Sequence, residues 1–241
     1  MKPLSPELLY YFHNLLTFIM IGVWIIFSFI GYKLKNQKII TKISYGLVGF
    51  SITQEMMDYV NRIFLDELYV ISLSADLPLQ FCSIGYYFSV LGIIMSISKK
   101  KYNIKFEQFI FDCAYVLGFG GALQAMITVD LTGINNMIGS LALNWQHSII
   151  ILNVLWLIFA YNKRFNLRGV LNAFIFMNLA IIPVGIINYF LDANYMFVCS
   201  PPNVNNPLLI GEWPTYLIIL EFIYFLYILI LYLPFRLLHK K

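Results

Sequence analysis

Seven long apolar runs constrain this chain more than any other feature of its sequence. A helix needs about 20 apolar residues to cross the hydrocarbon core of a bilayer, which is roughly 30 Å thick. We therefore predict membrane-spanning helices at residues 9–31, 43–62, 78–98, 106–128, 146–162, 169–191 and 214–236. Charged residues make up only 12% of the 241 residues, whereas soluble domains carry about 25%. The sequence predicts a single all-α membrane domain over residues 1–241, a polytopic bundle of about seven transmembrane helices.

Two of these runs are less regular than the others. The second contains Gln54, Glu55 and Asp58, and the fifth is short. The first run lies where a signal peptide would, but it is too long for one and lacks a small-residue cleavage site. We retain all seven because the distribution of positive charge supports that number.

Basic residues are confined almost entirely to alternate loops. Four clusters hold 14 of the 16 Lys and Arg residues: Lys33, Lys35, Lys38 and Lys42; Lys99, Lys100, Lys101 and Lys105; Lys163, Arg164 and Arg168; and Arg236, Lys240 and Lys241. Seven spans place all four clusters on one side, and loops rich in Lys and Arg face the cytoplasm. We therefore predict a cell-membrane protein whose N-terminus is outside and whose C-terminus is cytoplasmic. The clusters are short and form no continuous basic face, which argues against nucleic acid as a partner.

The cysteines do not suggest a disulfide framework or a metal site. There are three, Cys82, Cys113 and Cys199, an odd number without the spacing of metal ligands. The histidines and carboxylates are scattered and would make a poor zinc site. We expect neither a metal nor another cofactor.

Polar side chains within the predicted spans gather at one level of the bilayer. An ionisable residue inside a span is costly and by default faces the interior of the bundle, where it points to function. The outer halves of the spans contain His13, Glu55, Asp58, Gln80, Cys82, Gln124, His147 and Glu221. Asp112, near the cytoplasmic end of its span, is the main exception. We infer a polar cavity that opens to the outside or to the outer leaflet and is closed toward the cytoplasm.

Each of these residues also has a purely structural interpretation. A carboxylate such as Glu55 can pair with a neighbour and fix helix packing, and Gln124 can hydrogen-bond between helices. Cys82 alone would be a small hydrophobic residue, and Trp213 suits an anchor at the membrane interface. Gly120 and its neighbour Gly121 would admit either another helix or a lipid chain close to the backbone.

Four blocks of sequence carry a resemblance to a known family. They are LPLQFCSIGYY (77–87), GFGGALQAMITVDL (118–131), NWQHSIIIL (144–152) and NYMFVCSPPNVNNPLLIGEWPTYLIILEF (194–222). In this order they resemble the bacterial YwaF family of integral membrane proteins, a distant relative of eukaryotic transmembrane protein 164. The resemblance covers roughly residues 40–235 and implies the multi-span architecture. The eukaryotic branch is associated with acyl transfer on phospholipids, so the resemblance also implies membrane lipids as partners.

The chain departs from that family at one position that bears on chemistry. Family members typically read LPLHLC where this chain reads LPLQFC, so that Gln80 stands in the place of a histidine. Glutamine does not exchange a proton at neutral pH. If the family's chemistry requires that histidine, this chain has either lost the role or passed it to His147.

Two classes of function follow from these residues. In a lipid acyltransferase or hydrolase, Cys82 would be the nucleophile, His147 would take and return its proton, and Glu55 or Glu221 would orient the imidazole. Substrate contacts are expected from His13, Asp58, Gln80, Gln124, Asp130, Asn194, Tyr195 and Trp213. The sequence favours this class because the one-sided polar cluster contains both a thiol and an imidazole.

The alternative is a transporter or binding protein for a small cationic or polar solute. Glu55, Asp58 and Glu221 would then hold the solute, and Cys82 would only line the site. Such transporters typically contain broken helices and inverted repeats. Pro183 is the only strong breaker in the middle of a predicted span, and no repeat is evident. A structural membrane subunit is a third interpretation.

Overall fold

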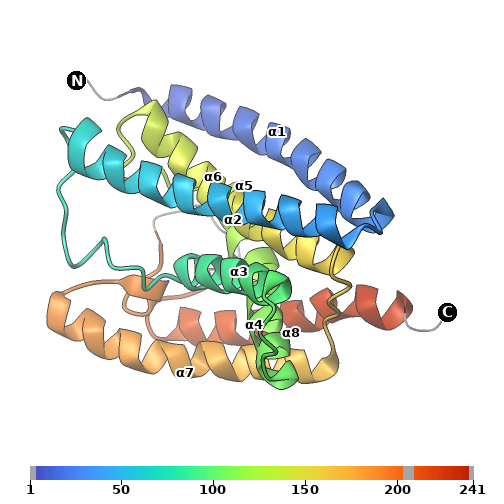
Figure 1. Ribbon diagram of the computed structural model, residues 1–241. Helices are drawn as coiled ribbons and strands as arrows, with labels where there is room; N and C mark the ends of the chain where they lie inside the picture. The colour runs from blue at the N-terminus through green and yellow to red at the C-terminus, as the bar shows by residue number, and fades with distance from the viewer. Residues whose placement is uncertain (1–3, 203–208, 239–241) are drawn as a thin grey trace.

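The computed structural model describes residues 4–202 and 209–238, and within this part of the chain it contains helices and no strand. Lys2, Lys240, Lys241 and part of the predicted outer loop lie outside the described residues. The helices are α1 (Pro6–Lys33), α2 (Gln37–Val60), α3 (Phe81–Ile97), α4 (Ile104–Leu117), α5 (Leu123–Ile127), α6 (Met137–Phe159), α7 (Leu167–Leu191) and α8 (Thr215–Leu238). Two π-helices, η1 (Asn61–Leu65) and η2 (Gly118–Ala122), and one 3-10 helix, η3 (Tyr195–Phe197), complete the set. Because η2 joins α4 to α5, the helices form seven rods (Figure 1).

The all-helical membrane architecture predicted from the sequence is confirmed at this level. Five rods are long and apolar enough to cross a membrane, namely α1, the α4–α5 rod (Ile104–Ile127), α6, α7 and α8. The apolar helix α3 is shorter, with 17 residues. Helix α2 is long but contains several charged residues, including Glu55 and Asp58. That α2 and α3 also cross the bilayer stays a prediction.

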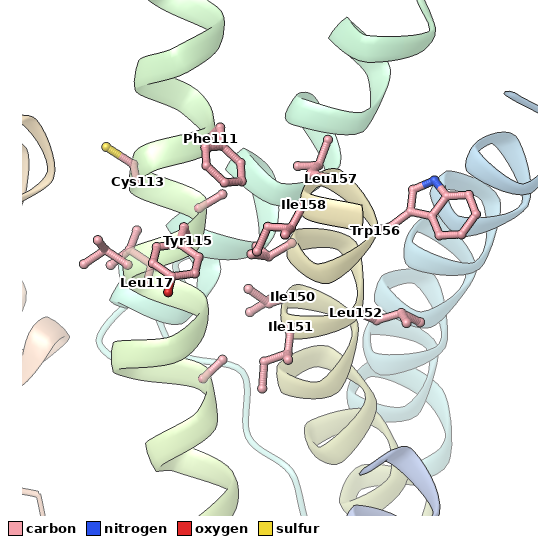
Figure 2. Close-up of a cluster of buried hydrophobic side chains, with 14 of the residues drawn as sticks. Phe111, Cys113, Tyr115, Leu117, Ile150, Ile151, Leu152, Trp156, Leu157 and Ile158 are labelled. Carbon is pink, nitrogen blue, oxygen red and sulfur yellow. The ribbon is translucent and has the colours of Figure 1, made fainter. Parts of the chain in front are cut away.

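Helix α6 is the centre of the bundle. In its most apolar stretch 72% of the residues are buried, whereas the corresponding shares are 17% in α1 and 11% in α8. Its apolar side chains pack against α4, and Figure 2 shows Ile150, Ile151 and Leu157 facing Phe111 and Tyr115 across this contact. The peripheral helices therefore present their apolar faces outward, as helices in a lipid bilayer do.

Buried hydrogen bonds tie α6 to its neighbours. The amide of Asn153 donates to the hydroxyl oxygens of Ser51 on α2 and Ser89 on α3, at 3.2 and 3.3 Å. The indole of Trp156 donates to Ser44 on α2, at 2.8 Å. In an apolar surrounding, such groups need partners within the protein. The polar residues of this half of α6 thus hold helices together.

Asparagine caps explain where several helices begin. Asn36, Asn103, Asn136 and Asn166 precede α2, α4, α6 and α7, and each side-chain oxygen accepts a hydrogen bond from a backbone N–H of the first turn. Such caps satisfy N–H groups that the helix itself leaves without partners. Helix α6 consequently starts at Met137, nine residues before the predicted start at residue 146.

Two predicted boundaries are therefore corrected. Gln146 and His147 were expected in the first turn of a short fifth span, yet they lie in the third turn of a 23-residue helix. The prediction failed because the polar residues in this segment resemble a helix start. Likewise α3 begins at Phe81, after the N-cap Gln80, and not at the expected Pro78.

The connecting segments gather at two ends of the bundle. The α1–α2 and α6–α7 connections and the end of α8 lie together, toward the right of Figure 1. We call this the basic end, because it contains the Lys and Arg clusters; Lys163 pairs there with Glu107, at 3.1 Å. The opposite, acidic end contains η1, η3 and the segments around residues 66–80 and 128–136.

Candidate functional site

A cavity of about 640 Å³ lies in the half of the bundle nearer the acidic end. Its walls come from the last turns of α2, the first turn of α3, η2, α5, the third turn of α6, the middle of α7 and the first turns of α8. Val198, Pro202 and Leu209, which follow η3 in the chain, also line it. Eight of the twelve predicted site residues line this one cavity: Glu55, Asp58, Gln80, Cys82, Gln124, Asp130, His147 and Glu221.

The lining differs between the two ends of the cavity. On the side of α2 and α6 it carries charged and amide groups, including Glu55, Asp58 and Gln146. On the side of α7 and α8 five apolar residues, Phe174, Met177, Ile181, Leu217 and Leu220, line it together with Asn178, Glu221 and Tyr224. Figure 1 places α2 and α6 on one side of α3, and α7 and α8 on the other. The cavity thus suits an amphipathic molecule, with a polar part toward α2 and an apolar part between α7 and α8.

Cys82 lies in the first turn of α3, against the glycines of η2. A Cβ atom at Gly121 would be 3.7 Å from Cys82 Sγ. The thiol is free, and in the described part of the chain it forms no hydrogen bond. The GFGG sequence forms a π-helical turn here, a distortion that often occurs at functional sites. The sulfur atom is therefore held beside a stretch of backbone that carries no side chain.

His147 presents a single ring nitrogen to the cavity. Its Nδ1 atom is 2.8 Å from the carbonyl oxygen of Leu143, one turn earlier in α6. A carbonyl only accepts, so Nδ1 carries the proton, and in the neutral ring Nε2 is left as the acceptor. The Leu143 carbonyl thereby orients the imidazole, which is the task that the sequence analysis gave to Glu55 or Glu221. Within the described chain, neither carboxylate bonds to His147; Glu55 instead accepts from Gln146, at 3.3 Å.

A network of charged groups forms one wall of the cavity. Arg62 in η1 forms ion pairs of 2.8 Å with both Asp58 and Asp76. Asp76 also accepts hydrogen bonds from the Tyr69 hydroxyl and from the backbone N–H of Ser72, the latter at 2.7 Å. Burial, together with the hydrogen bond to Asp76, raises the pKa of Tyr69 to about 12, so its hydroxyl stays a donor at neutral pH. The network fastens the segment before α3 to the end of α2.

Replacing Arg62 should loosen this wall. In Arg62→Ala, two partly buried carboxylates lose the one cation that pairs with them among the described residues, and we expect a loss of about 2 kcal/mol in stability. Arg62→Lys keeps the charge but not the two-pronged geometry, and should lie between wild type and alanine. Thermal unfolding in detergent measures the order. Lys163→Ala, which breaks a single pair at the basic end, is the matched control; an equal shift in both alanine variants would contradict the interpretation.

Four predicted site residues lie outside the cavity lining, and each is engaged in structure. His13 Nε2 is 3.1 Å from the Met126 carbonyl oxygen, and its ring also meets Asn144. Asn194 closes the turn after η3 by bonding to Ser200. Tyr195 is buried, and its hydroxyl donates to the Leu73 carbonyl at 2.8 Å. Trp213 donates to the Val198 carbonyl at 3.0 Å and is exposed.

The cavity also contains polar residues that the sequence analysis did not assign to the site. Arg62 and Asp76 were given no role there, although the Asp58–Arg62 spacing of four is typical of a pair on one helix face. Tyr224 lines the cavity from within an apolar span, and no sequence signal distinguishes it from the other tyrosines of α8. In the described residues no group of three or more His, Cys, Asp or Glu side chains is arranged to hold a metal ion.

Apolar helices around a one-sided polar cavity define a polytopic integral membrane protein. The chain belongs to the TMEM164 family, whose model it matches over residues 4–232. This match includes every helix that contributes to the cavity. No curated protein and no solved structure is detectably similar to the chain.

Proposed function

We propose that the protein is a membrane enzyme that transfers acyl chains between lipids, with Cys82 as the nucleophile and His147 as the base. One observation carries the proposal: a single cavity contains a thiol, an imidazole with a free nitrogen, and an apolar region between α7 and α8. The thiol comes from α3 and the imidazole from α6, and the two residues are 65 positions apart in the sequence. An acyl chain would lie along α7 and α8, and the ester group would meet Cys82.

The cavity would open outward at the cell surface, with the N-terminus outside, because the basic end would face the cytoplasm. All seven rods would span the cell membrane. The blocks LPLQFC and GFGGALQ favour the bacterial YwaF-like branch within the wider family.

The chemistry can be written with every proton in place. His147 Nε2 takes the proton from Cys82 Sγ, and the sulfur attacks the ester carbonyl carbon of a donor lipid. The carbon–oxygen ester bond breaks, and the leaving alkoxide takes the proton from His147. An acceptor hydroxyl then gives its proton to His147 and attacks the thioester carbonyl carbon; the carbon–sulfur bond breaks, and the leaving thiolate takes the proton from His147. In the described structure no hydrogen bond joins Cys82 Sγ to His147, so the first transfer requires a side-chain rotation or one bridging water, as is common in ligand-free sites.

The direct test is to trap the acyl-enzyme. Purified protein in lipid nanodiscs is incubated with phosphatidylcholine that carries an alkyne-tagged acyl chain, and the intact protein is examined by mass spectrometry. We expect a mass increase of one acyl group on Cys82, removed by neutral hydroxylamine and absent in Cys82→Ser. Cys113→Ser, which changes a buried cysteine that does not line the cavity, should behave as wild type. A hydroxylamine-stable adduct, or one that survives Cys82→Ser, would refute the thioester.

An excess of carboxylates in the lining supports a second candidate function. Among the residues that the structure describes, the cavity is lined by five carboxylates, those of Glu55, Asp58, Asp76, Asp130 and Glu221, and by one Lys or Arg side chain, that of Arg62. Asp58 and Asp76 are already paired with Arg62, so Glu55 and Glu221 are available to hold a small cation or amine. A carrier of this kind would lose solute binding in Glu55→Gln and keep it in Cys82→Ser. An acyltransferase, in contrast, would lose its activity in Cys82→Ser.

A further inference from the structure

Helix α8 meets the π-helical turn through two tyrosines that differ in one respect. Tyr227 donates its hydroxyl to the Phe119 carbonyl oxygen, at 2.8 Å. Tyr224 donates to the Val116 carbonyl oxygen, at 3.3 Å. Hydrogen bonds from hydroxyl groups are normally about 2.7 to 2.8 Å long and rarely exceed about 3.0 Å. The Tyr227 hydroxyl is therefore fully engaged, whereas that of Tyr224 holds its partner weakly.

The Tyr224 hydroxyl also lies where a side chain of η2 would otherwise be. A Cβ atom at Gly120 would be 2.2 Å from Tyr224 Oη and 2.8 Å from its Cζ atom. At the next glycine, Gly121, a Cβ atom would be in ordinary van der Waals contact with Cys82 Sγ, at 3.7 Å. The phenol and the thiol thus approach adjacent glycines of one turn, from α8 and α3 respectively. Both side chains line the cavity, whereas Tyr227 does not.

We propose that Tyr224 is a further catalytic residue, whose hydroxyl donates a hydrogen bond to the oxygen of the acyl carbonyl while Cys82 Sγ attacks its carbon. This inference rests on the acyl transfer proposed above. As the carbon–sulfur bond forms, the carbonyl oxygen gains negative charge, and a donor already in place stabilises it. The Tyr224 proton is shared with that oxygen and not transferred. When the tetrahedral intermediate collapses, the ester carbon–oxygen bond breaks and the hydroxyl can return to the Val116 carbonyl.

Gly120 has a specific structural role in this arrangement. Any side chain at position 120 would take the place of the phenol hydroxyl, so glycine is required for Tyr224 to reach the turn. The long bond to Val116 means that the hydroxyl loses little when it turns toward a substrate. Tyr227, with a bond of ordinary length to the same turn, serves to attach α8 and provides a matched control.

Two probes separate a role in the reaction from a role in the fold. Acylation is followed with 4-nitrophenyl palmitate, whose carbonyl oxygen becomes negative during attack, in nanodiscs containing the full chain. Alkylation is followed with N-hexadecyl iodoacetamide, which reacts at the same sulfur without forming an oxyanion. Tyr224→Phe should slow acylation by about 100-fold, the usual effect of removing one such donor, and leave alkylation unchanged. Tyr227→Phe should change neither rate.

The outcomes that overturn the inference differ from those that overturn the acyl transfer itself. If Tyr224→Phe slows both probes equally, the residue only supports the fold, and if it slows neither, its hydroxyl takes no part; both results refute the catalytic role. The proposed function falls separately if Cys82→Ser releases nitrophenolate as fast as wild type. Loss of acylation in Cys82→Ser with a normal rate in Tyr224→Phe would retain the nucleophile and remove the donor.

Discussion

Alkylation of Cys82 by N-hexadecyl iodoacetamide should slow by about 100-fold when His147 is replaced by glutamine, since general bases contribute roughly 100- to 10,000-fold. The reactive form of cysteine is the thiolate, and an apolar surrounding disfavours that charge. Among the described histidines, His147 alone lines the cavity, and its Nε2 atom is the acceptor because Nδ1 is bonded to the Leu143 carbonyl. Glutamine retains much of the volume of the side chain but cannot accept a proton.

The measurement needs a background in which only one thiol is accessible. Cys199 is exposed and would react with the probe, whereas Cys113 is buried. All variants are therefore made in Cys199→Ser, and the modified peptide is identified by mass spectrometry. His13→Gln is the matched control: it removes a buried histidine outside the cavity that is bonded to Met126 and Asn144. That change should lower the thermal midpoint and leave the labelling rate of the folded protein unchanged.

If the alkylation rate of Cys82 is unchanged in His147→Gln, Cys82 and His147 do not act as a catalytic pair. The carboxylates would then be the principal groups of the cavity, and the cationic-solute interpretation would gain support. If His13→Gln slowed labelling as much as His147→Gln, the effect would come from loosened packing of α6. The test thus distinguishes proton transfer from helix packing within one set of variants.

The sequence predicts the rods well because apolar length and alternating basic loops are local properties. Every predicted span overlaps a helix, and the basic clusters within the described residues lie at one end of the bundle. The errors arise where polar residues interrupt an apolar pattern. Asn144, Gln146 and His147 read as a helix start, but a bundle interior can satisfy such residues: Asn144 donates to the hydroxyl of Thr17 on α1, at 2.8 Å. The cap that begins α6 is Asn136, in a segment that lacks any strong pattern.

The site is less predictable than the fold because its assembly depends on which helices meet. Depth in the bilayer was enough to select Cys82 and His147, since residues at the same level of a bundle can share a cavity. It also selected His13, which is bonded to Met126 and Asn144 and does not line the cavity. The second tyrosine of the FIYFLY sequence, Tyr227, is as polar as the first, and only the packing of α8 on η2 separates their surroundings. The depth of a residue in the bilayer does not tell how its helix is rotated about its axis, and therefore does not tell which neighbours its side chain contacts.

Gly169→Ala should destabilise the protein by about 2 kcal/mol, within the usual 1 to 3 kcal/mol for an overpacked core. A Cβ atom at this position, in the first turn of α7, would be 2.6 Å from Asp112 Cγ and 2.7 and 2.8 Å from its two oxygens. The carboxyl group cannot move aside freely. It is buried, and its Oδ1 atom accepts from Gln108 at 2.7 Å. The clash outweighs the gain of about 1 kcal/mol that alanine brings to a helix.

Two further variants identify the source of the loss. Gly185→Ala, on the same helix, has no atom within 4 Å of the new methyl group, and should leave the thermal midpoint equal or higher. Asp112→Ala removes the group that clashes, and also a carboxyl oxygen, Oδ2, that has no hydrogen-bond partner among the described residues. Residues in contact show non-additive effects, so Gly169→Ala should cost much less in the Asp112→Ala background than in wild type. An equal cost in both backgrounds would mean that the approach of α4 to α7 tolerates the methyl group, and that another property of the helix start requires glycine.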